Sequence, residues 1–366
     1  MFHHTIVGKT VSQAVAESFE AILNDGHHQE SRNGGATALY NVNLVVTNPR
    51  CRHLNLNGRT SNIFQLIAET FWVMAGANAV RPYLEFFLPR AANYSDDGET
   101  WHGAYGSRLY KYNQIDDAVK LLAADKFSRR AVIQIAMPEL DSKPAIEGLY
   151  GKDHSPNDTP CNREAHAYVT PDNEFHLKLI QRSGDAIFGA GSINPFEFTF
   201  IQELMYNQLK KSHPELKLGY YTWSVTNYHL YDSTRQQAIN VLESPQCLYS
   251  DYLELTGPDF EDNPAFFGEL LSLYSYMITC DMPSTNVYTE CMDEINKVFS
   301  AYRVPTQRNL MFEYAQVLVM YILSKRGFTL PVSYYGCGLS NEYLSAIVNS
   351  KFREFSVFLG MEGSKP

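Results

Sequence analysis

Cys161 is the residue of this sequence best suited to covalent chemistry, because a cysteine thiolate is a strong nucleophile. It lies in a Pro-Cys-Asn turn, shortly before a predicted strand that ends near Arg182. Nearby cations favour the thiolate form. A single cysteine is more often inert packing than a nucleophile, so this interpretation depends on the residues that accompany it.

Three further side chains could move protons. Glu69 is the single acid in an apolar helix predicted over residues 65–75. Tyr105 lies in the segment HGAYG, and Asp185 lies in QRSGD. Each has a structural alternative, namely a buried glutamate satisfied by a neighbouring donor, an ordinary tyrosine among 24, and a carboxylate that caps a turn. His229 could likewise be a satisfied histidine in the core.

Four arginines could hold a phosphate dianion: Arg50, Arg129, Arg130 and Arg182. Guanidinium groups form paired, charge-assisted hydrogen bonds worth roughly 1.5 to 3 kcal/mol each, so several together could fix a mononucleotide. Taken singly, each is more often a solvated surface residue.

The order and chemistry of these motifs resemble thymidylate synthase and the related pyrimidine nucleotide hydroxymethylases over about residues 48–232. The matching segments are AETFWVMAG, HGAYG, Pro-Cys, QRSGD, GAGSINPF and His-x-Tyr. The resemblance implies that the catalytic residues are Cys161, Glu69, Tyr105 and Asp185. It implies that the nucleotide is bound by Arg50, Arg129, Arg130, Gln181, Arg182, Ser183, Asn194, His229 and Tyr231. It implies that the one-carbon donor is 5,10-methylenetetrahydrofolate, bound by Glu69, Trp101 and Asp185.

The mechanism implied by this resemblance begins with addition of Cys161 to C6 of a pyrimidine nucleoside monophosphate, which activates C5. A polar network around Asn194 and Glu69 would stabilise the resulting charge. Loss of the C5 proton through Tyr105, and proton transfer from Glu69 to the departing folate, would leave an exocyclic methylene group. Hydride would convert this group to methyl, whereas water would convert it to hydroxymethyl.

Three departures from thymidylate synthases favour water, and therefore favour deoxyuridylate 5-hydroxymethylation. Residues 82–97 contain no tryptophan, Asn162 replaces the usual histidine, and the last residues read GMEGSKP instead of a short apolar tail. Thymidylate synthase and a dCMP or CMP hydroxymethylase are alternatives, and a non-enzymatic nucleotide-binding homologue is a more remote one. Asn194 favours uracil, because its amide can pair with the N3–H and O4 groups of that base.

Hydrophobic periodicity gives the elements that must position these residues. A polar loop is predicted over residues 23–36, and the strand after it has Tyr40, Val42, Leu44 and Val46 on one face. Further strands are predicted over residues 131–137, 175–181 and 218–225, with a helix over 196–209. After about residue 250 the pattern predicts helices only, over residues 265–280, 287–302 and 309–325. Their most apolar stripes should be core faces: Phe266, Phe267, Tyr274 and Met277, then Leu310, Tyr314, Leu318 and Tyr321.

The fold class we expect is α/β (α+β), with the three-layer arrangement of the resembling family: a large twisted mixed sheet flanked by helices. Residues 1–250 would form the catalytic core, and residues 251–366 a helical C-terminal subdomain packed on it. In that family the pair corresponding to Arg129 and Arg130 comes from the neighbouring subunit, which implies a homodimer.

Composition limits the partners. A formal net charge of −10 argues against a duplex nucleic acid, because binding to duplexes requires an extended basic surface. The six cysteines lie far apart without metal-ligand spacing, so we expect no metal site. The first residues lack the apolar core of a signal peptide, and the longest apolar run, residues 317–323, is too short to span a membrane. We therefore expect a soluble cytoplasmic protein, of a cell or of a virus-infected host.

Overall fold

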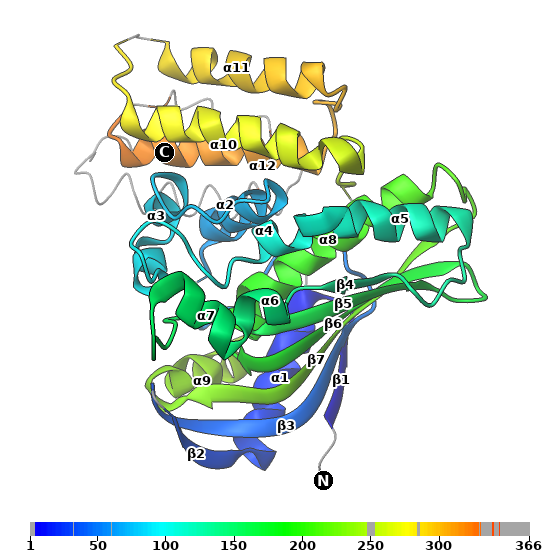
Figure 1. The fold of residues 1–366 in the computed structure, drawn as a ribbon, viewed down its shortest axis with the longest axis vertical. Helices are drawn as coiled ribbons and strands as arrows, with labels where there is room; N and C mark the ends of the chain where they lie inside the picture. Colours follow the sequence, from blue (N-terminus) through cyan, green and yellow to red (C-terminus); the bar gives the residue numbers. More distant parts are fainter. Residues whose placement is uncertain are drawn as a thin grey trace.

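The computed structural model describes residues 4–31, 33–59, 61–246, 253–283 and 286–328, and residues 330, 339 and 344. Within these residues, seven strands form one twisted mixed sheet, as Figure 1 shows. The order across the sheet is β1 (His4–Gly8), β3 (Gly34–Val46), β7 (Lys217–Tyr231), β6 (Glu174–Asp185), β5 (Asn162–Val169) and β4 (Val132–Gln134), with β2 (His27–Ser31) paired to β3. The β1–β3 and β6–β7 pairs are parallel, and the others are antiparallel. The predicted mixed sheet is confirmed.

The two faces of the sheet differ in burial. Leu44, Trp223, Leu179 and Ala165 are successive neighbours across four strands and are all buried. Helix α1 (Val11–Asp25) packs against β1 and β3, and α8 (Asn194–Leu209) packs against β6 and β7. Residues that alternate with the buried set are half-exposed, so the second face is open in the single chain.

The predicted loop over residues 23–36 is wrong. Helix α1 runs to residue 25, and β2 then pairs antiparallel with β3 in a hairpin. The sequence HHQES of β2 is polar on both faces because this edge strand is almost entirely exposed, so it lacks apolar periodicity. The sequence pattern placed Tyr40 on the same face as Val42, Leu44 and Val46, but Tyr40 is exposed. Asn41 has a φ of 56°, which interrupts the alternation of the strand at this point.

The long helices agree with the sequence pattern. Helix α2 (Ile63–Met74) is capped by the Asn62 side chain, which accepts a hydrogen bond from the amide of Gln65. The shorter helices are α3 (Tyr83–Phe87), α4 (Tyr105–Leu109), α5 (Gln114–Ala124), α6 (Pro138–Asp141), α7 (Lys143–Tyr150) and α9 (Arg235–Glu243).

The three predicted C-terminal helices are confirmed as α10 (Asn263–Thr279), α11 (Val287–Ala301) and α12 (Leu310–Lys325). Figure 1 shows them as a layer above α2 and α3, and both α10 and α12 contact α2. The Phe71 ring of α2 meets Phe267 of α10 at 5.0 Å between centroids, and Phe64 stacks on Tyr321 of α12 at 4.3 Å. All eight residues predicted as core faces of α10 and α12 are buried. The boundary at residue 250 stays a prediction.

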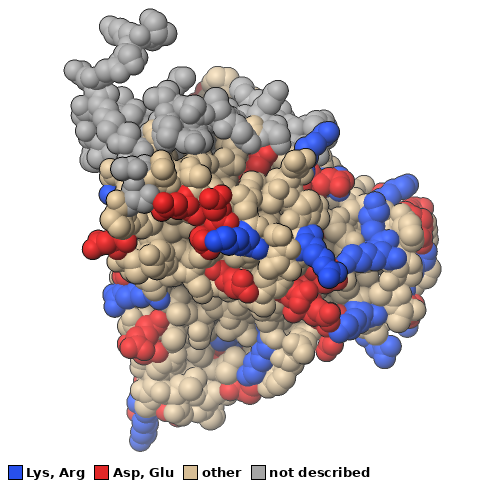
Figure 2. All heavy atoms as spheres, turned by 90° about the horizontal axis from the view of Figure 1, so that it is seen from above, with Lys and Arg blue, Asp and Glu red and all other residues tan. Residues whose placement is uncertain are grey.

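Figure 2 views the molecule from above this helical layer. Acidic and basic side chains lie side by side over the visible described residues. Among the described helices, none is both long enough and apolar enough to cross a membrane.

A buried ion pair connects the sheet, α8 and the C-terminal layer. Arg52, just after β3, pairs with Glu203 of α8, and both side chains are fully buried. The Glu203 carboxylate also accepts from Arg50 Nε at 2.9 Å and from the Leu255 amide at 3.2 Å. This carboxylate therefore joins three segments that are distant in the sequence.

We predict that Glu203→Gln lowers the free energy of unfolding by about 3–5 kcal/mol, because it leaves the buried Arg52 charge without a counter-ion. Urea unfolding monitored by circular dichroism measures the change. The control is Glu254→Gln, which removes the 62% exposed partner of Arg50 and should change stability by less than about 1 kcal/mol. Equal effects of the two substitutions would contradict the assigned role of Glu203.

Candidate active site

A cavity of about 500 Å³ lies where the ends of β6 and β7 meet α2, α4 and the start of α8. Ten of the residues predicted from the sequence line it: Glu69, Trp101, Tyr105, Cys161, Arg182, Ser183, Asp185, Asn194, His229 and Tyr231. Because β6 and β7 run parallel, Asp185 lies beside His229, and Ser183 lies beside Asn227. The sheet register thus brings four polar side chains to one edge of the cavity.

Cys161 immediately precedes β5, and its loop is held by Arg182 of β6. The Arg182 amide donates to the Cys161 carbonyl at 2.9 Å. The guanidinium donates to the carbonyls of Pro160 at 3.2 Å and Thr159 at 2.9 Å. Arg182 therefore fixes the cysteine loop from the neighbouring strand.

Gln181 was predicted to bind substrate, but its side chain does not line the cavity. It is fully buried and donates from Nε2 to Oδ1 of Asn162, its cross-strand neighbour. Alternate residues of a strand point to opposite faces, so Gln181 contacts Asn162 from one face of β6 and Arg182 holds Pro160 and Thr159 from the other. The structure gives Gln181 and Asn162 a supporting place behind Cys161.

Glu69 and Gln65 are half-buried, whereas the other ten residues of α2 are buried. Gln65 Nε2 donates to Glu69 Oε2 at 3.3 Å. Burial raises the pKa of Glu69 to about 7, against the opposing effects of that hydrogen bond and of the Arg90 charge. A carboxyl group with this pKa can both give and accept a proton near neutral pH.

Tyr105 is the first residue of α4, which packs very closely on α2. A Cβ atom at Gly106 would lie 2.5 Å from the Val73 carbonyl oxygen, so this contact requires glycine. Burial, together with the nearby charges of Cys161 and Asp158, raises the pKa of Tyr105 well above its ordinary value. Its phenol therefore stays protonated at neutral pH and can donate a hydrogen bond.

Asp185 caps a turn, as the structural alternative proposed. Its Oδ1 accepts from the amides of Ile187 at 2.7 Å and Phe188 at 3.3 Å. Arg59 Nη2 donates to the Ile187 carbonyl at 2.7 Å and supports the same turn. A π-helical turn, Gly189–Ile193, follows and places Asn194 at the start of α8. Such turns are frequent at functional sites.

His229 and Tyr231 are two residues apart on β7 and so share a face. Their rings meet at 4.9 Å in an edge arrangement. Asn33, at the tip of the β2–β3 hairpin, donates from Nδ2 to the Tyr231 hydroxyl at 3.2 Å. The hairpin also contributes Gln29 and Ser31 to the lining, and β7 contributes Asn227.

Of the four arginines predicted to bind the phosphate, Arg182 alone is in the cavity lining described for one chain. Arg50 lies outside the cavity, because its guanidinium is paired with Glu203 and Glu254, and we withdraw it from the nucleotide site. Arg129 and Arg130 are exposed between α5 and β4, and Arg130 lines a separate cavity of about 690 Å³. Arg90, which no sequence motif indicated, lines the first cavity and lies 4.5 Å from the Phe188 ring centroid.

One wall of the cavity is aromatic. The Trp101 ring stacks on Tyr94 at 4.8 Å between centroids and lies 6.0 Å from Trp72. All three rings line the cavity, together with Leu88 and Phe188. A flat, partly apolar ligand fits such a wall. Thus Trp101 supplies a tryptophan ring, which residues 82–97 lack, although their Tyr94 belongs to the same wall. The segment GMEGSKP lies outside the described residues. No cluster of metal-ligating side chains occurs among the residues that the structure describes.

A family model and three phage enzymes are similar to this chain. Residues 13–262 match the family model described as thymidylate synthase. The chain is 42% identical over 356 residues to a deoxyuridylate hydroxymethyltransferase of Delftia phage PhiW-14, covering 96% of this chain and 97% of that one. Proteins of the same name from Pseudomonas phage M6 and Bacillus phage SP01 are 30% and 24% identical, over 61% and 70% of this chain and 60% and 69% of their own lengths.

We predict that Glu69 makes folding stability depend on pH between about 4.5 and 7. Because its folded-state pKa is raised, its stabilising contribution is complete below about pH 4.5 and is lost as the pH rises through about 7. Glu69→Gln does not titrate, so its free energy of unfolding relative to wild type should be higher at pH 8 than at pH 5. Denaturant unfolding at both pH values tests this, with the exposed Glu20→Gln of α1 as the control. A pH-independent difference would show that the Glu69 carboxyl is not perturbed.

Proposed function

The chain belongs to the thymidylate synthase family, and we propose that it converts dUMP to 5-hydroxymethyl-dUMP through a covalent adduct between Cys161 and C6 of the base. One observation carries this proposal: Cys161, Glu69 and Asn194 meet in one cavity of a chain that matches a deoxyuridylate hydroxymethyltransferase over nearly its whole length. The enzyme is thus a one-carbon transferase.

The nucleotide is proposed to lie along the ends of β6 and β7. His229 and Tyr231 would bind the sugar hydroxyl, and Asn194 would pair with N3–H and O4 of uracil. Arg182 would bind the 5′-phosphate while it holds the cysteine loop. The pose follows from the arrangement of the lining, in which these side chains lie on neighbouring strands and on the helix that follows them.

Cys161 then adds to C6, and the negative charge that develops on the C4 oxygen is stabilised by the polar groups around Asn194. Tyr105, whose phenol stays protonated, donates a hydrogen bond to a water molecule, and that water removes the C5 proton. Glu69, whose pKa of about 7 allows both protonation states, donates the proton that releases the spent carrier.

The one-carbon donor is proposed to be 5,10-methylenetetrahydrofolate, which supplies a methylene group at the oxidation level of formaldehyde. The aromatic wall of Trp101, Tyr94 and Trp72 fits its flat ring system. Asp185 and Glu69 line the same cavity and could accept hydrogen bonds from ring N–H groups.

We predict that the protein, incubated with dUMP and labelled methylenetetrahydrofolate, forms 5-hydroxymethyl-dUMP and tetrahydrofolate in equal amounts. Mass spectrometry of the nucleotide and absorbance of the folate measure both products. Cys161→Ala should abolish turnover and the covalent adduct with 5-fluoro-dUMP, while nucleotide binding changes little. Thymidylate formed in step with dihydrofolate would instead identify a thymidylate synthase, and turnover of dCMP would identify a cytidylate hydroxymethylase.

We also propose that a second copy of this chain covers the open face of the sheet and supplies Arg129 and Arg130 to the partner's cavity. Cross-strand neighbours on this face, Glu164, Ile180, Ser224 and Asn43, are all half-exposed. Two aromatic side chains of the same face, Tyr168 and Tyr220, are 39% and 45% exposed. Such a broad face is suited to a symmetric contact between identical subunits.

Complementation tests this arrangement. Cys161→Ala and the double variant Arg129→Ala/Arg130→Ala should each be inactive or nearly so, yet subunit exchange between them should restore about a quarter of wild-type activity. The reason is that each heterodimer holds one site with both an intact cysteine and intact arginines. Mixing Cys161→Ala with Arg182→Ala is the control and should restore nothing, because both residues come from the same chain. Failure of the first mixture would rule out shared sites.

A further inference from the structure

The cavity contains a carboxylate that the motifs of the chain leave without a role. Asp158 lies three residues before Cys161 and lines the same cavity as Trp101 and Tyr105. We propose that Asp158 is the general base that takes a proton from the water molecule that adds to the exocyclic methylene group. This inference rests on the proposed hydroxymethylation and assigns its final step.

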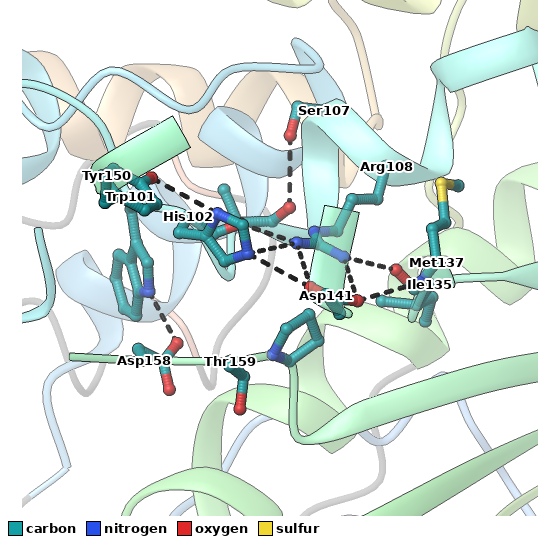
Figure 3. A network of polar contacts seen from close by, with 12 residues as sticks. Trp101, His102, Ser107, Arg108, Ile135, Met137, Asp141, Tyr150, Asp158 and Thr159 are labelled. Carbon is teal, nitrogen blue, oxygen red and sulfur yellow. Dashed lines mark hydrogen bonds and ion pairs between the residues drawn. The ribbon is translucent and has the colours of Figure 1, made fainter. Parts of the chain in front are cut away.

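The structure fixes the position of this carboxylate. Trp101 Nε1 donates to Asp158 Oδ2 at 2.7 Å, and Figure 3 shows the indole directed at Asp158. A Cβ atom at Gly103 would lie 2.4 Å from the same oxygen and 3.4 Å from Trp101 Nε1. A Cβ atom at position 103 would therefore displace the Asp158 carboxylate from this hydrogen bond.

A buried network holds the loop that carries Trp101 and Gly103. Arg108 is almost fully buried and forms two hydrogen bonds of 2.8 Å with the Asp141 carboxylate (Figure 3). The same guanidinium donates to the His102 carbonyl at 2.9 Å and to the Ile135 carbonyl at 3.0 Å. Residue 102 is thereby tied to the core, which fixes its two neighbours in the cavity wall.

The segment that carries Asp158 is fixed from its other side. Arg182 Nη2 donates to the Thr159 carbonyl at 2.9 Å and to Thr159 Oγ1 at 3.1 Å. The Asp158 carboxylate and the Cys161 sulfur are therefore held by one short segment, anchored by Trp101 at one end and by Arg182 at the other. A general base needs such positioning relative to the nucleophile whose adduct it serves.

The other ionisable groups of the cavity are less suited to this step. The carboxylates in its described lining are Glu69, Asp158 and Asp185. Asp185 is assigned to the folate ring and its Oδ1 already accepts from two backbone amides of its own turn, and Glu69 is assigned to proton donation. The Tyr94 and Tyr105 phenols stay protonated, because burial and the adjacent negative charges, including that of Asp158, raise the pKa of each. With His229 and Tyr231 assigned to the sugar hydroxyl, Asp158 is the remaining base in the described lining.

The step is balanced in atoms and charge. The water oxygen forms a bond to the methylene carbon, the electrons of the exocyclic double bond move to the C4 oxygen, and Asp158 takes one water proton. The C4 carbonyl then re-forms, the C5–C6 double bond is restored, and the C6–S bond breaks to release the Cys161 thiolate. Asp158 returns its proton to solvent. No oxidant or reductant is required.

Asp158→Asn tests the assignment, because the amide oxygen can still accept from Trp101 but the side chain cannot take a proton. We expect the adduct with 5-fluoro-dUMP and tritium release from C5-tritiated dUMP to stay within about threefold of wild type. Formation of 5-hydroxymethyl-dUMP should fall about 100-fold or more. Added 2-mercaptoethanol, whose thiolate needs no base, should capture the methylene group as a thioether in the variant. Asp172→Asn, an exposed substitution in the β5–β6 turn, is the control.

Two results would overturn the inference: an unchanged rate of hydroxymethyl formation, or a parallel loss of adduct and tritium release that places Asp158 before the water step. Wild-type protein that forms thymidylate and dihydrofolate would refute the proposed function itself, which distinguishes the two failures.

If Asp158→Asn does not fold, Gly103→Ala displaces the carboxylate without removing its charge. This second variant should shift the product in the same direction, and normal hydroxymethylation by it would count against Asp158.

Discussion

The structure depends on burying a helix that is apolar on every side and carries one carboxyl group. Ten of the twelve residues of α2 are buried, and the remaining two, Gln65 and Glu69, are bonded to each other at the cavity. A helix of this kind is stable only when other elements cover all of it. The sheet side supplies α8, and the C-terminal layer supplies α10 and α12. The helices after residue 253 are therefore part of what keeps this helix buried.

A second dependence runs from the sheet to the nucleophile. The parallel pairing of β6 and β7 sets the register of the polar side chains at one end of the sheet. The same strand β6 carries Arg182, whose backbone and side chain both bind the loop of Cys161. The nucleophile is thus positioned by strand register, and the acid by helix packing. These two constraints meet in one cavity, whose lining includes both Cys161 and Glu69.

The sequence predicts those features whose cause is local. Continuous or periodic apolar patterns gave α2, α8 and the three C-terminal helices, because burial dictates residue type along a helix. The same reasoning failed for β2, which is a polar edge strand, and for Tyr40, whose alternation is broken by the left-handed Asn41. Motif order indicated the residues around Cys161, yet it could not separate Gln181 from Arg182 by function, because that depends on which face of β6 each occupies. The motifs placed Arg50 in the nucleotide site and gave no role to Arg90, whereas the structure pairs Arg50 with Glu203 and Glu254 and places Arg90 in the cavity lining. The acidic partners of a surface arginine depend on tertiary structure, so the motifs could not indicate them.

The residue near Cys161 that bears most directly on the product is Asp158, and not Asn162. Asn162, the substitution that first suggested a wetter site, is fully buried behind the cysteine and bound to Gln181, so it acts on the cavity only through the strand that it supports. Asp158 lies in the cavity wall itself, and its partner Trp101 also forms the aromatic surface proposed for the one-carbon donor. Departure of that donor would leave the Asp158 carboxylate bordering the space that water must enter. One tryptophan can in this way serve both halves of the reaction, with its ring face toward the donor and its N–H toward the base.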